Sequence, residues 1–277
     1  MALATAVPLG FGLAAEEVTR VDRRPATAVA FVAVGPAIVA YALPRGLVAA
    51  GLALPWLVAA AVLGVGALVR LVTWAKSRSR RSESATLGFA VAAGFLAVAA
   101  GWAVIDRLGV RPFAFGTTIV LLTAVHFHVA GFVLTLAAVL AARARPTPIS
   151  VGAVSGLIAG TPLTALGFFG LPAINWIGAM VVAISGIGVG LATVATSGAH
   201  ACVGASPGRR WNQATRFLLR VAGATLFLTM PLAAAYATGT TFGIPFLDVP
   251  AMAAIHGGLN VVGFAIPAML GWSLVAE

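Results

Sequence analysis

Eight long apolar stretches, separated by short polar or Pro/Gly-containing breaks, set the strongest limit on how this chain can fold. Each is close to the length of about 20 residues that a helix needs to cross a bilayer. With 61% hydrophobic and only 9% charged residues, the chain cannot be an ordinary soluble domain. We therefore predict an all-α, polytopic transmembrane helix bundle whose eight spans cover residues 26–43, 47–71, 85–105, 115–142, 149–170, 173–198, 214–237 and 250–274.

The spans predict a simple domain organisation. Residues 1–25 form an N-terminal cytoplasmic or interfacial segment, and residues 26–277 form a single transmembrane domain. Residues 1–14 are apolar but lack a basic n-region, so we interpret them as an interfacial or docked segment rather than a signal peptide. No internal repeat or low-complexity tract is apparent.

The basic residues predict the orientation. The N-terminal segment and the loops after the second, fourth and sixth spans hold 14 of the 17 Lys and Arg residues, and the alternate loops hold only Arg45, Arg107 and Arg111. The positive-inside rule then places both termini in the cytoplasm. The net charge of +10 does not indicate nucleic-acid binding, because the basic residues lie at span ends. The lone Cys202 excludes an internal disulfide.

Two histidines lie inside the fourth predicted span. A titratable side chain in hydrocarbon is costly unless it has a partner, which makes His126 and His128 functional candidates. They are two residues apart and point about 200° from one another on an α-helix, so they cannot bind one ion together without a distorted helix. We expect one ring to face the centre of the bundle and the other to face a neighbouring helix. The alternative is a structural role, with each ring donating to a backbone carbonyl or a threonine.

The last predicted span carries a second polar pair. His256 and Asn260 share one helix face, so the Asn amide can fix a tautomer of the imidazole. The alternative is a polar pair that packs helices together. A histidine of the fourth span paired with His256 would be able to bind haem or a transition metal, but there is no third strong ligand. We therefore predict neither a metal nor a cofactor.

Other polar and aromatic groups are predicted in the outer half of the membrane. Asp106 ends the third span, either as an interfacial ion pair with Arg107 or as a proton donor. The predicted site is an outward-biased intramembrane cavity. Its catalytic candidates are Asp106, His126, His128 and His256, and its substrate-binding candidates are Trp102, Phe127, Phe132, Trp176, Asn260 and Asn175.

Several stretches resemble the YndJ-like family of bacterial integral membrane proteins. They are Leu52–Trp56, Arg111–Phe115, Ile119–Phe132, which contains the specific His126-Phe127-His128 core, Ala165–Phe168 and His256–Phe264. The resemblance covers most of the chain from residue 26 onward and implies the fold and a location in the bacterial inner (cytoplasmic) membrane. This chain has Val129 where relatives are expected to carry an aromatic residue, which suggests a reshaped pocket.

Three functions are compatible with these residues. The first is an enzyme that uses acid–base chemistry on a lipophilic small molecule, with proton-initiated cyclisation or isomerisation of an isoprenoid as the leading example. It is favoured because the polar groups are confined to one half of the bilayer, although no acid lies deep in a span. The second is a small-molecule or proton-coupled transporter, which lacks a visible inverted repeat. The third is a haem- or metal-binding protein. The oligomeric state is unknown from the sequence.

Overall fold

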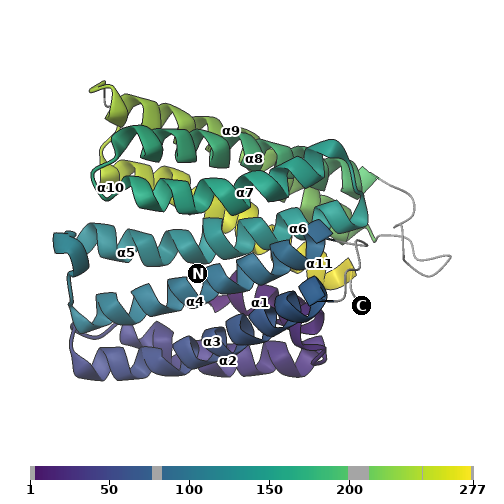
Figure 1. Ribbon diagram of the computed structural model, residues 1–277, viewed down its shortest axis with the longest axis horizontal. Coiled ribbons are helices and arrows are strands. Elements are labelled where there is room, and N and C mark those ends of the chain that lie inside the picture. Colours follow the sequence, from purple (N-terminus) through teal and green to yellow (C-terminus); the bar gives the residue numbers. More distant parts are fainter. Residues whose placement is uncertain (1–3, 77–82, 199–211, 245, 276–277) are drawn as a thin grey trace. The chain divides into compact units, whose positions relative to one another are not determined.

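A computed structural model describes residues 4–76, 83–198, 212–244 and 246–275, and the described part of the chain is helical throughout, without strands (Figure 1). Eight helices in the described part of the chain are long and apolar enough to cross a membrane, which confirms the predicted all-α polytopic bundle. They cover Arg23–Ala40, Leu47–Lys76, Ala85–Leu108, Thr117–Ala144, Pro148–Gly167, Pro172–Gly198, Gln213–Thr241 and Val249–Val275. Cys202 and five of the basic loop residues lie outside the described residues.

The chain divides into two compact units, residues 1–136 and 137–277. In the first unit α2 (Arg23–Ala40) packs against α3 (Leu47–Lys76), and α3 packs against α4 (Glu83–Leu108). The chain then passes through a short 3₁₀ turn, η2 (Pro112–Ala114), into α5 (Thr117–His126). Neighbours in sequence are thus neighbours in space, as short loops between antiparallel helices require.

The N-terminal residues form a helix that is packed inside the first unit. Helix α1 (Ala6–Thr19) contacts α2, α3 and α4, and Val7, Phe11 and Ala14 are buried. Its 14 residues reach only about 21 Å, which is too short to cross a bilayer. Because a helical segment that is apolar on all sides must be covered by protein or lipid, burial among the spans accounts for the composition of residues 6–15, the apolar part of α1.

The second unit begins within α6 (Thr135–Ala144) and repeats the serial packing. Helix α7 (Pro148–Gly167) packs against α8 (Pro172–Gly198), and α8 packs against α9 (Gln213–Thr241). A short helix, α10 (Val249–Met252), begins the last span, which ends as α11 (Ile266–Val275). Small residues allow the close approach of these helices, since the glycine backbones of Gly190 on α8 and Gly223 on α9 face one another.

Side-chain caps define where several helices of the second unit begin. The Thr147 hydroxyl accepts a hydrogen bond from the Ser150 backbone N–H in a capping box, and Pro148 occupies the first turn. Asn212 caps α9 in the same manner. Asp248 accepts from the Ala251 backbone N–H at 2.7 Å and so begins α10.

The two spans that carry the histidines are irregular. The fourth span changes from α-helix to π-helix over η3 (Phe127–Leu134), and the last span does so over η4 (Ala253–Gly257) and η5 (Asn260–Ala265). These are the π-helical segments of the described residues. The spacing of the histidines was interpreted on a regular α-helix, and the two spans depart from that geometry. π-Helical turns are rare and are frequent at functional sites, so these segments single out the two spans.

Candidate functional site

His128 lies on η3 and is buried, with both ring nitrogens hydrogen bonded. Its Nδ1 lies 2.8 Å from the Ala124 carbonyl oxygen, and the Trp56 indole N–H of α3 donates to its Nε2 at 3.0 Å. A neutral ring with its proton on Nδ1 satisfies both contacts. The Phe11 ring of α1 in turn lies 5.9 Å from the Trp56 ring. His128 therefore joins the fourth span to α3 and, through Trp56, to α1.

His126 differs from its neighbour because its side chain is exposed. Its Nδ1 lies 2.8 Å from the Leu122 carbonyl oxygen, four residues earlier on α5. A donated Nδ1–H leaves the lone pair of Nε2 at the exposed edge of the ring. Among the described residues no partner contacts that nitrogen. The expectation that the two histidines point in different directions therefore matches their surroundings.

His256, Asn260 and Thr229 form a hydrogen-bonded network in the second unit. The Thr229 hydroxyl of α9 donates to Asn260 Oδ1 at 3.0 Å, and the Asn260 amide donates to the His256 carbonyl oxygen at 2.9 Å. The same amide lies 3.1 Å from His256 Nε2, and His256 Nδ1 lies 3.0 Å from the Thr229 carbonyl oxygen. An Nδ1–H tautomer of His256 fits both contacts. The Asn amide thus orients the imidazole, and Thr229 fixes the amide.

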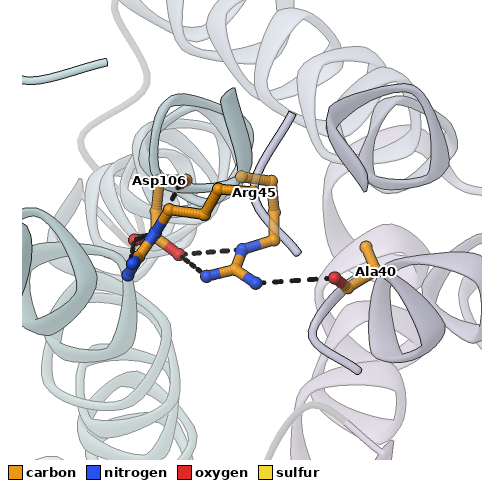
Figure 2. A network of polar contacts seen from close by, with 4 residues as sticks. Ala40, Arg45 and Asp106 are labelled. Carbon is orange, nitrogen blue, oxygen red and sulfur yellow. Dashed lines mark hydrogen bonds and ion pairs between the residues drawn. The ribbon is translucent and has the colours of Figure 1, made fainter. Parts of the chain in front are cut away.

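Asp106 is held between two arginines at the end of α4 (Figure 2). Arg45 donates from Nη2 to Asp106 Oδ1 at 2.9 Å, and Arg107 donates from Nε to Oδ2, also at 2.9 Å. Only 1% of the Asp106 side chain is exposed, and Arg107 also reaches the Ala40 carbonyl oxygen at the end of α2. The carboxylate links the α2–α3 turn to α4. Each of its oxygens accepts from a guanidinium, so the geometry favours the predicted ion pair over a proton donor.

Tyr41 completes this cluster just beyond the end of α2. The Arg107 guanidinium carbon lies 4.3 Å from the centre of the Tyr41 ring, in a cation–π arrangement. Burial raises the pKa of Tyr41 to about 12, and the Asp106 carboxylate acts in the same direction while the two arginines oppose it. The phenol is therefore neutral at physiological pH, and its ring serves to cover the buried guanidinium.

The predicted substrate-binding residues are distributed over both units. In the first, Phe132 is fully buried, Trp102 is half-buried, and the Phe127 ring packs 5.6 Å from that of Phe95. In the second, Asn175 donates to the Thr164 carbonyl oxygen at 2.8 Å, and the Trp176 indole donates to the Thr238 hydroxyl at 3.1 Å. The polar groups of Asn175 and Trp176 thus bind α7 and α9. One cavity that gathers all ten candidates stays a prediction.

Three partners of these residues were missed by the sequence analysis. Trp56 was noticed only as part of the family resemblance, although a buried indole N–H needs an acceptor and a nearby histidine supplies one. Arg45 was treated only as a topology marker, although it precedes a span at the same boundary as Asp106. Thr229 could not be singled out from the sequence, because an isolated threonine in an apolar stretch gives no indication of its partner. Within the described residues, no group of three His, Cys, Asp or Glu side chains is close enough to hold a metal ion.

The Trp56–His128 hydrogen bond gives a first testable prediction. Trp56→Phe keeps an aromatic ring against Phe11 but leaves His128 Nε2 buried without a donor. We expect the free energy of unfolding to fall by about 1–3 kcal/mol, the cost of one unsatisfied buried polar group. The thermal midpoint of the purified protein measures this. Trp102→Phe is the matched control, and an equal effect of both changes would contradict the assignment.

The fold and these polar clusters define a polytopic integral membrane protein. A family model described as YndJ-like protein matches residues 1–264, so the chain belongs to the YndJ-like family, as its His-Phe-His core indicated. It is 27% identical over 226 residues to the "Uncharacterized membrane protein YndJ" of Bacillus subtilis (strain 168). That alignment covers 81% of this chain and 38% of the relative, so the chain spans about two-fifths of the relative's length. No solved structure matches the chain.

Proposed function

We propose that this protein transports a small solute across the bacterial cytoplasmic membrane, with both termini in the cytoplasm. The observation that carries the proposal is the change from α- to π-helix across the polar stretch of the fourth and the last span. Irregular helices at membrane depth are typical of transporters, where freed backbone groups and kinks accommodate movement around a solute. Prolines inside four further spans support the same reading: Pro36, Pro55, Pro162 and Pro231.

His126 is the residue that would carry a coupled proton. Its Nδ1–H is engaged by Leu122, and its Nε2 lone pair is exposed and open. Imidazole is the side chain best suited to gaining and losing a proton near neutral pH. His128 and His256 are less suitable proton carriers because their Nε2 atoms are already engaged. Nε2 of His128 accepts a hydrogen bond from the Trp56 indole, and Nε2 of His256 lies beside the Asn260 amide. These contacts favour His126 as a single proton-exchanging residue over a proton relay through all three histidines.

The enzyme hypothesis is the second candidate. A proton-initiated cyclisation is disfavoured, because it needs a proton donor and both carboxylate oxygens of Asp106 accept hydrogen bonds from Arg45 and Arg107. An isomerisation of a prenylated lipid needs only one group that removes and returns a proton, and the open Nε2 of His126 satisfies that need. The half-buried Trp102 and Phe127 belong to the same unit and would line an apolar substrate. The bilayer itself would deliver such a substrate.

Proteoliposomes that enclose a pH-sensitive dye distinguish the two functions. We expect one of three external solute classes (amino acids, carboxylic acids or organic cations) to change the internal pH with the native protein. With His126→Ala the change should fall to the rate of empty liposomes, while His126→Gln tests whether polarity alone suffices. No response to any class would contradict coupled transport. An isomer formed from added prenyl alcohols or prenylated quinols, detected by mass spectrometry and slowed about 10²-fold by His126→Ala, would instead support the enzyme.

A further inference from the structure

Glycine and proline positions recur in the same order in the two halves of the chain. In both halves a proline begins the first span, a glycine lies in the turn after it, and a Gly-Val-Gly sequence lies inside the second span. The spacing from the turn glycine to Gly-Val-Gly is the same, from residue 46 to 64 and from 170 to 188. The corresponding residues are Pro25 and Pro148, Gly46 and Gly170, Gly64–Gly66 and Gly188–Gly190, and Gly109 and Gly243.

The turns of the two units share a backbone feature. Gly46 and Gly170 follow the first span of their units with φ of +156° and +84°, and Gly109 and Gly243 follow the third span with φ of +77° and +72°. Among the described residues these four are the glycines with positive φ. Residues with a side chain rarely adopt this backbone region, so the chain reverses by the same means at equivalent places.

The fourth spans carry the longest shared motif. Val129-Ala130-Gly131-Phe132 corresponds to Val261-Val262-Gly263-Phe264, and both phenylalanines are buried. Each glycine marks a close approach to the third span of its own unit. A Cβ on Gly131 would lie 3.0 Å from Phe95 Cβ on α4, and one on Gly263 would lie 2.6 Å from Thr225 Oγ1 on α9. The two fourth spans therefore pack on the third spans through the same position.

This alignment brings His128 and Asn260 into register. His128 Nδ1 hydrogen bonds to the carbonyl of residue 124, and the Asn260 amide donates to the carbonyl of residue 256, in both cases four residues earlier. The remaining acceptor of each side chain is bound from another span, by the Trp56 N–H in the first unit and by the Thr229 hydroxyl in the second. Both side chains thus donate to the carbonyl four residues earlier and accept from another span, and the Asn260 amide makes a further contact with His256 Nε2.

We infer that the chain is a tandem repeat of one four-span unit, and that His128 and Asn260 are the same position of that unit. Each fixes the π-helical part of a fourth span to its own unit. The repeat was not apparent from the sequence because the shared residues are isolated within apolar stretches that resemble any membrane helix. His126 has no counterpart, since Gly258 occupies its position in the second unit. The inference is independent of the proposed transport.

Exchanging the side chains at the equivalent positions tests the register. An Asn at position 128 keeps one donor for the Ala124 carbonyl and one acceptor for the Trp56 N–H, the two kinds of group that Asn260 uses with its own partners. We expect His128→Asn to keep the thermal midpoint within about 3 °C of the native protein, and His128→Leu, of similar volume, to lower it by about 5 °C or more. Asn260→His and Asn260→Leu form the reciprocal pair. If His128→Asn is as unstable as His128→Leu, the equivalence is wrong.

A second experiment tests the parallel orientation that a four-span repeat requires. The residues that follow the four glycines are all exposed: Leu47, Val110, Leu171 and Ile244. Each is replaced singly by Cys in a Cys202→Ser background, and intact cells are treated with a membrane-impermeant maleimide. We expect all four positions to be labelled alike. Opposite labelling of Leu47→Cys and Leu171→Cys, or of Val110→Cys and Ile244→Cys, would overturn the repeat.

Discussion

Replacing Asp106 with Asn is expected to cause the largest loss of stability among single changes to the polar groups. The substitution leaves the Arg45 and Arg107 guanidinium groups without their shared carboxylate, and an amide presents a donor where an acceptor is needed. Breaking a buried ion pair by removing one partner costs about 3–5 kcal/mol. The thermal midpoint and the yield of folded protein measure the effect.

The exposed Arg111 supplies the control for this prediction. It lies near the same end of α4, and Arg111→Gln is expected to change stability by no more than about 0.5 kcal/mol. Together the two variants separate the structural role of Asp106 from the catalytic role that the sequence allowed. A native midpoint with lost activity in Asp106→Asn would identify the carboxyl group as a proton donor.

Gly178→Ala is expected to have the second large effect, through backbone contact between α7 and α8. A Cβ on Gly178 would meet the Leu163 carbonyl carbon at 2.8 Å and lie against the Thr164 backbone nitrogen. A helix backbone cannot rotate away as a side chain can, so the two helices must separate. Overpacking of this kind costs about 1–3 kcal/mol or more. Unfolding in detergent followed by tryptophan fluorescence measures it.

Gly152→Ala is the matched control because Gly152 lies on α7, the helix that Gly178 of α8 contacts, and a Cβ there meets nothing within 4 Å. At that position Ala is expected to stabilise the helix by about 0.5–1 kcal/mol, since glycine loses more backbone entropy on folding. Equal destabilisation by the two changes would show that the contact seen at Gly178 does not limit the approach of α7 and α8.

Much of the candidate site was accessible from residue spacing. The four-residue separation of His256 and Asn260 predicted one face and an amide that orients an imidazole, and both are present. The two-residue separation of His126 and His128 predicted rings that point apart, one toward the bundle centre and the other toward a neighbouring helix. The His128 ring is buried against Trp56, whereas the His126 ring is exposed. These inferences succeeded because helix geometry fixes which side chains of one span lie together.

Partners on other spans were not accessible in this way. The Trp56 donor to His128 is 72 residues away, and the Thr229 donor to Asn260 is 31 residues away. In an apolar sequence every helix face looks alike, so nothing in the sequence states which face of one span meets which face of another. The role of Asp106 was left open for the same reason, since Arg45 belongs to a different turn.

The sequence by itself determined that this is a helical membrane protein, with the eight spans found among the described residues, and which spans carry its polar residues, because span length and hydropathy are local properties set by the bilayer. Tertiary structure decided that Asp106 is clamped by two arginines, that His128 and Asn260 are satisfied by side chains from other helices, and that His126 keeps an open ring nitrogen. Those features depend on packing between spans, where the position of one small residue decides which polar groups meet.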